Sequence, residues 1–190
     1  MSLRRCLLRI PIMTNHGNLR FRPATSVDAT AIHEIYAPYV RDTAISFETE
    51  IPTVTELSAR IEKTQQTHAW VVAESDAGIV GYAYASEHKA RSAYRWSVTV
   101  SVYLRPDAQR LGLGSRLYQA LFAALRERGY VMAYAGIVLP NAGSIGLHRK
   151  LGFEPVGIYR NVGYKLGHWH DVAWWQLQLQ PPPTPAIPLR

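Results

Sequence analysis

The chain has 190 residues, a hydrophobic fraction of 47% and a formal net charge of +7. This length and composition are typical of a single globular domain that can bury a core of its own. No apolar run is long enough to cross a bilayer, because Arg9 and Pro11 close the short N-terminal run. The first residues also lack the apolar segment and cleavage site of a signal peptide. No membrane partner is therefore expected.

The positive charge is only a weak argument for nucleic-acid binding. Arg4, Arg5 and Arg9 lie in residues 1–17, a segment without an acidic residue, so the remainder of the chain is only mildly basic. It has no basic and aromatic array, and we expect no nucleic-acid partner. Cys6 is the only cysteine, which excludes an intramolecular disulfide and fits a reducing cytoplasm. The seven histidines show no spacing typical of a closed metal site, so no metal is expected.

The two ends of the chain differ from its middle. Residues 1–17 are expected to form a flexible arm, within which Met13 competes with Met1 as the true start. One domain should cover residues 18–180. The tail, residues 181–190, begins with four prolines in five positions, a sequence that cannot join a sheet and should be extended or flexible.

In chain order, the first expected elements are a strand and a helix. The strand should begin near residues 19–22. Ser26 is a suitable N-cap for the helix, whose end Pro38 should distort. Its apolar positions are Ala29, Ile32, Ile35, Tyr36 and Tyr39. A loop should follow over residues 43–52.

A second helix and a hairpin come next. Thr53 and Glu56 have the spacing of a capping box, and the helix that this box begins should run to about Lys63. Residues 69–74 and 79–86 predict two strands that form a hairpin, because Asp76-Ala77-Gly78 between them is a turn sequence.

Residues 96–125 predict a strand, a loop and a helix. Apolar residues alternate with other residues as far as Leu104, which indicates a half-buried strand that Pro106 ends. The following helix has one apolar stripe, and Gly129 stops it. The strand alternates Trp96, Val98, Val100, Val102 and Leu104 with Ser97, Thr99, Ser101 and Tyr103, and the helix stripe is Leu113, Leu117, Leu121 and Leu125.

The C-terminal third completes the expected sheet. Residues 131–138 predict a strand, and Pro140-Asn141 leads into a short helix that ends at Leu151. Residues 154–159 and 172–179 predict the last two strands. The resulting order, β-α-α-β-β-β-α-β-α-β-β, predicts a mixed α/β sheet with helices on both faces.

The loop Gln109-Arg110-Leu111-Gly112-Leu113-Gly114 lies between a strand and the N-terminus of a helix. Glycines there let the backbone turn tightly and present bare N–H groups, which favours an anion site. Two interpretations stay open: a pyrophosphate cradle, or a tight turn and no more. The pattern is neither GxGxxG nor GxxxxGK[ST], which excludes a Rossmann site and a P-loop.

The string QRLGLG after VYL resembles the acetyl-CoA signature Q/R-x-x-G-x-G/A of the GNAT N-acetyltransferase superfamily. Other segments are similar to its phosphinothricin N-acetyltransferase branch, and the resemblance runs from about Leu19 to Leu179. They are Lys89–Tyr94, Val102-Tyr103, Leu139–Asn141, Leu147-His148, Leu151–Phe153, Gly163–Lys165 and Trp169–Val172. The resemblance implies the GNAT acyl-CoA N-acyltransferase fold, in which central strands splay apart at a bulge and the face assignment over residues 96–104 would slip by one.

The resemblance implies transfer of acetyl from acetyl-CoA to the primary amine of a small amino-acid-like acceptor, of the phosphinothricin, methionine sulfone or methionine sulfoximine type. It also implies a homodimer, which is common among the relatives. Two alternatives stay open. One is a GNAT enzyme for a polyamine, an aminoglycoside or a protein N-terminus. The other is an acyl-CoA-binding module whose catalysis is weakened.

The resemblance also implies which residues hold acetyl-CoA. N–H groups of the loop would bind the pyrophosphate, with Arg110 as a charged partner, and the backbone of the central strand would pair with pantetheine and polarise the thioester carbonyl. Asn141 matches a second cofactor contact, and a helix N-cap is an equal alternative. The full set is Val102, Tyr103, Leu104, Gln109, Arg110, Leu111, Gly112, Leu113, Gly114, Ser115 and Asn141.

At the position of the base, this sequence departs from its relatives. Thr99 stands where the branch usually has a Glu, and a hydroxyl cannot serve as a base, although it could orient a water. Substitute bases are Glu87, His88, Glu48 and His148, each of which has a surface or packing role as its alternative.

His148 is the best of these substitutes, because it stands where many GNAT enzymes have the Tyr that protonates the CoA thiolate. Its imidazolium could act as that acid, or its neutral imidazole as a base. The alternative is a histidine on a helix surface beside Leu147 and Leu151.

The resemblance places the acidic end of the acceptor near Lys89, Arg91 and Tyr94, since an Arg fork binds two oxygens at once. Without the resemblance, these three residues would be interpreted as a solvated turn. Phe47 and Glu48 are implied to lie near the acceptor, with packing as an equal alternative for Phe47. Residues 159–165 and 169–171 are expected to shape the pocket wall or a dimer contact.

Overall fold

The computed structural model describes residues 19–109, 111–186, 188 and 189. The expected arm with Met13, and Arg110 in the loop, lie outside the described residues. A seven-stranded sheet in the order β1-β2-β3-β4-β5-β7-β6 forms the centre of the molecule. Its β4 and β5 run parallel, and the other neighbouring pairs are antiparallel. The predicted mixed α/β fold and its element order are confirmed.

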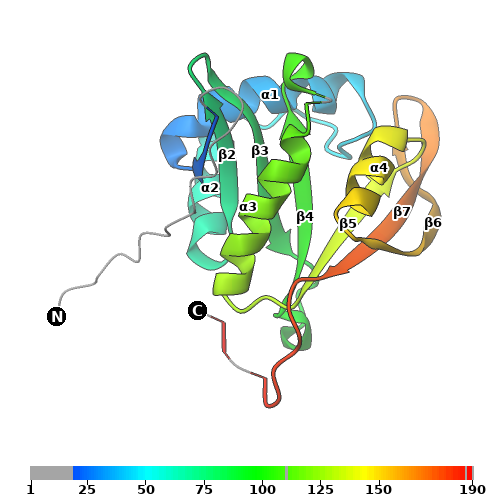
Figure 1. Cartoon of the computed structure of the whole chain (residues 1–190). Helices are drawn as coiled ribbons and strands as arrows, with labels where there is room; N and C mark the ends of the chain where they lie inside the picture. Colours follow the sequence, from blue (N-terminus) through cyan, green and yellow to red (C-terminus); the bar gives the residue numbers. More distant parts are fainter. Residues whose placement is uncertain (1–18, 110, 187, 190) are drawn as a thin grey trace.

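The elements follow the predicted order closely (Figure 1). The strands are β1 (Arg20–Pro23), β2 (Trp70–Ser75), β3 (Gly78–Glu87), β4 (Ser97–Leu104), β5 (Met132–Val138), β6 (Glu154–Lys165) and β7 (His168–Gln178). The helices are α1 (Ala29–Asp42), α2 (Val54–Thr67), α3 (Leu113–Glu127) and α4 (Ala142–Lys150). Three short 3₁₀ turns are η1 (Ser26–Asp28), η2 (Ser92–Tyr94) and η3 (Pro106–Ala108).

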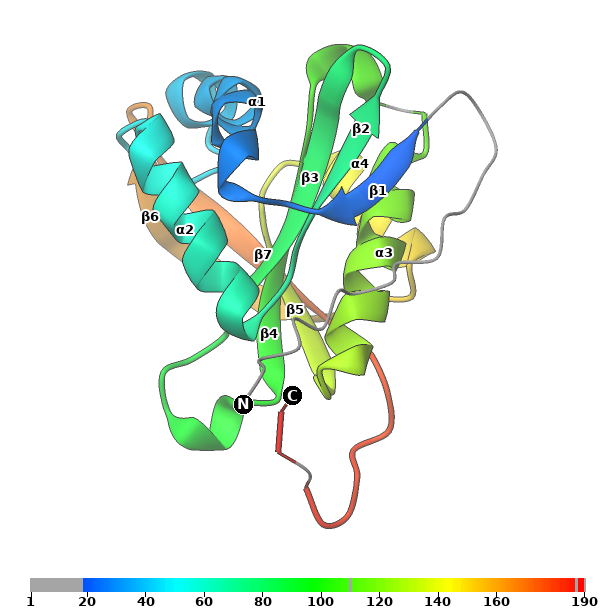
Figure 2. The same cartoon turned by 90° about the vertical axis from the view of Figure 1, so that its left-hand side faces the viewer.

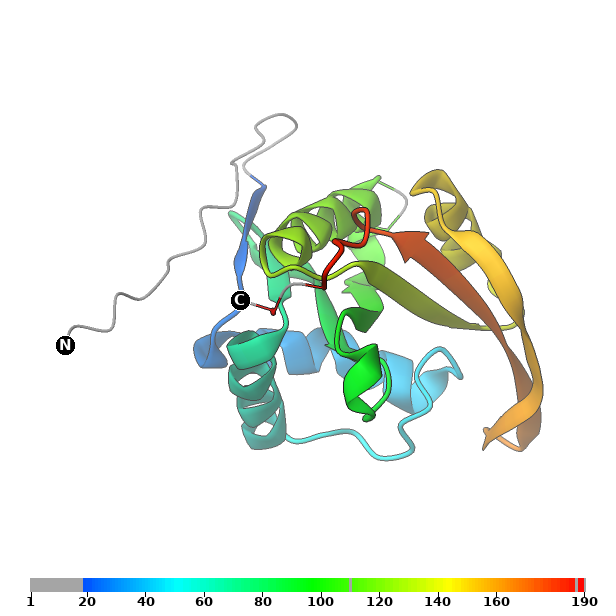
Figure 3. The ribbon, with the colours of Figure 1, turned by 90° about the horizontal axis from the view of Figure 1, so that it is seen from below.

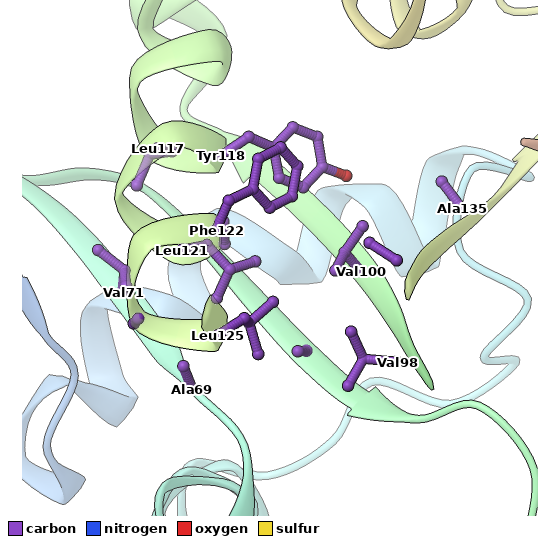
Figure 4. Packing of buried hydrophobic residues seen from close by; sticks show 14 of the residues in the cluster. Ala69, Val71, Val98, Val100, Leu117, Tyr118, Leu121, Phe122, Leu125 and Ala135 are labelled. Carbon is purple, nitrogen blue, oxygen red and sulfur yellow. The ribbon is translucent and has the colours of Figure 1, made fainter. Parts of the chain in front are cut away.

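Helices cover both faces of the sheet. Figure 2 shows α1 and α2 on one side of it and α3 on the other. The larger core cluster packs beneath α3, where Leu117, Leu121 and Leu125 form the predicted apolar stripe (Figure 4). A second cluster lies beneath α1 and α2 and contains Tyr36, Tyr82 and Tyr103. Each cluster buries one face of the sheet, which is the main stabilising contribution to the fold.

The faces of β4 keep the predicted alternation along its whole length. Val98 and Val100 belong to the cluster beneath α3, and Tyr103 belongs to the opposite cluster. The pairing of β3 with β4 continues without a shift from Gly81 opposite Leu104 to Glu87 opposite Val98. The expected slip of one residue at a bulge is therefore wrong.

The beginning of α1 and the role of Pro38 differ from the predictions. Asp28, not Ser26, is the N-cap residue of α1, and Ser26 lies in the preceding η1. Thr25 is the N-cap residue of η1, and its N–H (2.8 Å) and hydroxyl (3.2 Å) donate to the Asp28 carboxylate. Pro38 lies inside α1, which continues to Asp42. The carbonyl that loses its donor at Pro38 belongs to the exposed Glu34, where water can replace the missing N–H.

The capping box of α2 is confirmed, but the helix is longer than predicted. The Glu56 N–H donates to the Thr53 hydroxyl (3.2 Å), and the Thr53 N–H donates to the Glu56 carboxylate (2.7 Å). The helix passes Lys63 because Gln65 donates to the carbonyls of Ala24 and Trp70, both at 2.9 Å. These tertiary contacts leave no local signal in the sequence.

The last hairpin is also longer than predicted. β6 continues past Tyr159 to Lys165, and β7 begins at His168. Figure 3 shows the two strands as a ribbon on the side of the molecule away from β1. Nearly all of β6 is exposed, so its sequence has no alternation of burial that could have marked its length.

The described residues of the tail, 181–186, 188 and 189, form no helix or strand, and Leu189 packs against the larger cluster. Among the described helices, none is long and apolar enough to span a membrane. Within the same part of the chain, no group of three His, Cys, Asp or Glu side chains could hold a metal ion.

Candidate active site

The site begins where β4 and β5 separate. They pair only over Ser97–Thr99 and residues 132–134, and farther along the two strands diverge (Figure 1). The splay implied by the family resemblance is therefore confirmed. The gap forms a small cleft of about 50 Å³, which we call the β4–β5 cleft. Its lining includes Val100 to Tyr103, residues 135–138, Tyr118, Asn141, Ser144 and His148.

His148 closes this cleft from α4 and is only 3% exposed. Its Nδ1 lies 2.8 Å from the Ser144 carbonyl, which can only accept, so Nδ1 carries a proton. Burial lowers the pKa of His148, partly opposed by this hydrogen bond, and favours the neutral ring. Nε2 of the neutral ring therefore accepts from the Tyr118 hydroxyl, 3.2 Å away. The alternative of a histidine on the helix surface is wrong.

Tyr118 is a site residue that sequence analysis missed. It is 1% exposed on α3, next to the stripe of leucines, and its position alone predicts a core residue. Figure 4 shows its hydroxyl on the side toward Ala135 of β5. Burial raises the pKa of the hydroxyl, so it stays protonated and remains a hydrogen-bond donor.

The glycine loop leads directly into α3. Gly112 is the N-cap residue with φ +74°, a left-handed conformation that suits glycine. The first N–H groups of α3, from Leu113 to Ser115, lack helical acceptors and carry the positive end of the helix dipole. Leu111 is 77% exposed, and Gly114 is buried against Leu147. This arrangement can hold an anion at the N-terminus of α3.

Gln109 has an anchoring role that the sequence did not indicate. Its side-chain amide donates to the Tyr39 hydroxyl (3.1 Å), which itself donates to the Leu104 carbonyl (2.7 Å). The loop is thereby tied to α1 and to the end of β4. Asn141 is the N-cap of α4, since its side chain accepts from the Ser144 N–H at 3.0 Å, and it also lines the β4–β5 cleft. Its N-cap interpretation is confirmed and is compatible with a cofactor contact.

A second cavity of about 580 Å³ opens toward the α1 and α2 face, and we call it the acceptor cavity. Thr99 lines it, together with the predicted Phe47 and Glu48. Tyr159, from the range 159–165 expected to shape the pocket wall, lines it as well. Three aromatic residues that sequence analysis did not single out for the site form much of the remaining wall: Tyr36, Tyr84 and Trp174. It shares Ile45, Ser101, Tyr103, Gly136 and Val138 with the β4–β5 cleft, so the two spaces adjoin.

Polar groups fix one wall of the acceptor cavity. Glu48 forms an ion pair with Arg60 (2.6 Å) and accepts from the Tyr36 hydroxyl (3.1 Å). Lys165 donates to the Ser46 carbonyl (2.6 Å). The Phe47 ring lies where a Cβ on Gly163 would be, so Phe47 has a packing role in addition to lining the cavity.

Lys89, Arg91 and Tyr94 lie on the exposed connection between β3 and β4. Among the described residues, those that line the acceptor cavity do not include these three. Lys89 lies over the Tyr94 ring, with its Nζ 5.2 Å from the ring centroid. The same connection holds His88, whose ring contacts Tyr94 and hydrogen-bonds Thr99. The connection therefore reaches the cavity through His88.

Comparisons with known proteins agree with this arrangement. A family model described as the acetyltransferase (GNAT) domain matches residues 21–174. Phosphinothricin N-acetyltransferase of Streptomyces viridochromogenes is 40% identical over 90% of this chain and 94% of its own length. The L-methionine sulfoximine/L-methionine sulfone acetyltransferase of Pseudomonas aeruginosa is 38% identical over 84% of this chain and 94% of its own.

A solved GNAT superfamily phosphinothricin acetyltransferase from Sinorhizobium meliloti, in complex with AcCoA, is similar in fold. It superposes with a TM-score of 0.80 at 34% identity and covers 84% of this chain and 88% of its own. The chain therefore belongs to the GNAT family of acetyltransferases. It is an acetyl-CoA-dependent N-acetyltransferase.

The left-handed N-cap gives a first prediction. Gly112→Ala should lower the free energy of unfolding by about 1 kcal/mol, because an alanine disfavours a positive φ. A Cβ at Gly112 would meet nothing within 4 Å, so no clash contributes. Gly146→Ala in α4, also in open space, is the matched control and should be stabilising by about 0.5 kcal/mol. Urea denaturation measures both, and equal effects of the two variants would contradict the prediction.

Proposed function

We propose that this enzyme acetylates the primary amine of a small amino-acid-like acceptor of the phosphinothricin, methionine sulfone or methionine sulfoximine type. The observation that carries the proposal is the meeting of the β4–β5 cleft with the acceptor cavity. A thioester in the first space and an amine in the second can approach through their shared wall. The names of the relatives support an amino-acid-like acceptor.

Acetyl-CoA would bind along the splayed edge of β4. Backbone groups of Val102 to Leu104 would pair with pantetheine and polarise the thioester carbonyl. The loop of residues 109–115 would hold the pyrophosphate at the N-terminus of α3, with Arg110 as its charged partner. Asn141 at the start of α4 would close the other side.

As the C–S bond breaks, the Tyr118 hydroxyl would turn from His148 Nε2 and donate its hydrogen bond to the departing thiolate. It is protonated and lies at the closed end of the cleft, whereas neutral His148 has its proton bound to the Ser144 carbonyl. His148 would then act as a positioning residue that holds the Tyr118 hydroxyl in place until the thiolate forms. This tautomer fits a positioning role better than the roles of acid or base considered for His148, because both ring nitrogens are already hydrogen-bonded.

The β6–β7 ribbon supports a homodimer. Its exposed apolar side chains are Val156, Ile158, Tyr159, Val162, Tyr164, Leu166 and Trp169. A patch of this kind on an edge strand is unusual in a monomer and invites association. Tyr159 and Val162 also line the acceptor cavity, so a second copy on this ribbon would border the acceptor.

The acceptor assignment predicts thiol release from acetyl-CoA with phosphinothricin and methionine sulfone, and far less with polyamines or aminoglycosides. Arg91 is not among the described residues that line the acceptor cavity, and we propose that it binds the acidic end of the acceptor from the exposed connection that reaches the cavity through His88. Arg91→Ala should then raise KM for these carboxylated amines more than for their amides, because it removes a fork for two oxygens. Polyamine turnover instead would overturn the acceptor class. Acetyl-CoA binding without thiol release from any amine would support a binding module.

Tyr118→Phe should lower kcat by roughly 10²-fold without weakening acetyl-CoA binding, because it removes the donor to the leaving sulfur. Tyr130→Phe is the matched control, since it removes a buried hydroxyl that donates to the Thr67 carbonyl (3.0 Å) away from the site. It should cost stability but leave kcat unchanged. Equal kcat for the two variants would exclude the role of Tyr118.

Trp169→Glu should shift the protein from dimer to monomer in sedimentation velocity, because it places a charge in the exposed ribbon. Val27→Glu changes a residue that is 84% exposed on η1 and should leave the dimer intact. A monomeric wild type would contradict the proposed dimer outright.

A further inference from the structure

Thr99 and His88 form a hydrogen-bonded pair at the acceptor cavity. The Thr99 Oγ1 lies 3.1 Å from the His88 Nδ1. Thr99 lines the cavity, while His88 lies just beyond the end of β3 and is not among the described residues that line the cavity. A hydroxyl placed between a substrate nitrogen and an imidazole can pass a proton from one to the other.

Aromatic rings hold His88 in this orientation. Its ring stacks on Tyr134 of β5 with centroids 4.2 Å apart and planes 14° apart. Trp174 of β7 and Tyr94 of η2 meet it edge-on at 6.0 and 6.3 Å. Three separate elements therefore fix the ring, which leaves Nδ1 directed at Thr99.

The surroundings of His88 favour a neutral imidazole. Burial lowers the pKa of His88, and the nearby positive charge of Lys89 lowers it further. Among the described residues, the other titratable groups in contact with the ring are the phenols of Tyr94 and Tyr134. A neutral ring protonated on Nε2 has a lone pair on Nδ1 for the Thr99 proton.

The other acidic or basic side chains near the acceptor are less suitable. The carboxylate of Glu48 already accepts from Arg60 and Tyr36. Glu87 is exposed at the end of β3. His148 lies on the cofactor side of the sheet, with both ring nitrogens hydrogen-bonded.

We propose that Thr99 and His88 together replace the missing carboxylate as the base of the reaction, an inference that rests on the proposed function. The amine nitrogen attacks the thioester carbon, and the C–N bond forms. The surplus proton of the nitrogen passes to Thr99 Oγ1 while the Thr99 proton passes to His88 Nδ1. The C–S bond then breaks, the thiolate at the Tyr118 end of the cleft takes a proton from water, and the imidazolium returns its proton to the hydroxide that this leaves. Thr99 touches the substrate, and His88 acts through it.

The test is the pH dependence of kcat/KM for thiol release, on the amine that wild type acetylates best. Wild type should lose activity as the pH falls through a pKa below about 6.5, because protonated His88 cannot accept. His88→Asn keeps an acceptor for the Thr99 hydroxyl but cannot take its proton. It should lower kcat/KM by roughly 10²-fold and abolish this acidic limb.

Variants at Thr99 test the relay from its other end. Thr99→Val should lower kcat/KM by as much as His88→Asn does. The double variant should lower it little further than either single variant, because the two residues act as a unit. Thr99→Ser keeps the hydroxyl and should keep most of the rate. Thr99→Glu in the His88→Asn background should recover activity, because it supplies a carboxylate directly.

His68 offers a matched control for His88. Its Nδ1 lies 2.8 Å from the Thr67 hydroxyl, its ring stacks on Tyr130, and burial lowers its pKa, yet it lies away from both cavities. His68→Asn should change neither rate nor pH profile. If His88→Asn and Thr99→Val also leave both unchanged in an active enzyme, the relay is wrong and the proposed function stands. If wild type acetylates no amine, the proposed function fails and the relay fails with it.

Discussion

The separation of β4 from β5 after Thr99 is the constraint on which the site depends. A central sheet strand normally satisfies its backbone groups on both edges, and burial without a partner is costly. Here β4 keeps β3 on one edge but loses β5 on the other beyond Thr99. The free edge can pair with an extended ligand, which is how a strand recognises an amide-containing chain such as pantetheine. The capacity of the fold to bind an extended ligand therefore comes from the unpaired edge of β4 beyond Thr99.

In the proposed reaction, the groups that act on the sulfur and those that act on the amine lie on opposite faces of the sheet. Val98 and Val100 face the core beneath α3, whereas Thr99 and Ser101 face the acceptor cavity. Because side chains alternate along a strand, neighbouring residues serve opposite faces. Groups that assist the leaving thiolate can thus lie on one face and groups that take the amine proton on the other. This division keeps the proton that leaves the amine apart from the proton that the thiolate gains.

Much of the fold followed from the sequence, because alternation, leucine spacing and capping residues are local signals. The splay and the proposed acetyl-CoA role of the glycine loop came from family resemblance. Contacts between distant residues were not predictable in the same way. The Tyr118–His148 pair joins two helices. The end of α2 is set by tertiary hydrogen bonds from Gln65. The His88–Thr99 contact depends on the register of β3 and β4, which sets Ser86 opposite Thr99 and carries His88 just beyond.

A neutral base has a physical advantage in this cavity. A carboxylate at position 99 would be a fixed negative charge facing an acceptor that, as proposed, carries its own acidic group. Repulsion between like charges at close range in a partly dehydrated space would weaken acceptor binding. A hydroxyl hydrogen-bonded to a neutral imidazole avoids that repulsion. The imidazole becomes positive only as the proton is transferred to it. The charge then develops in the transition state, where it attracts the acidic group and helps the reaction more than substrate binding.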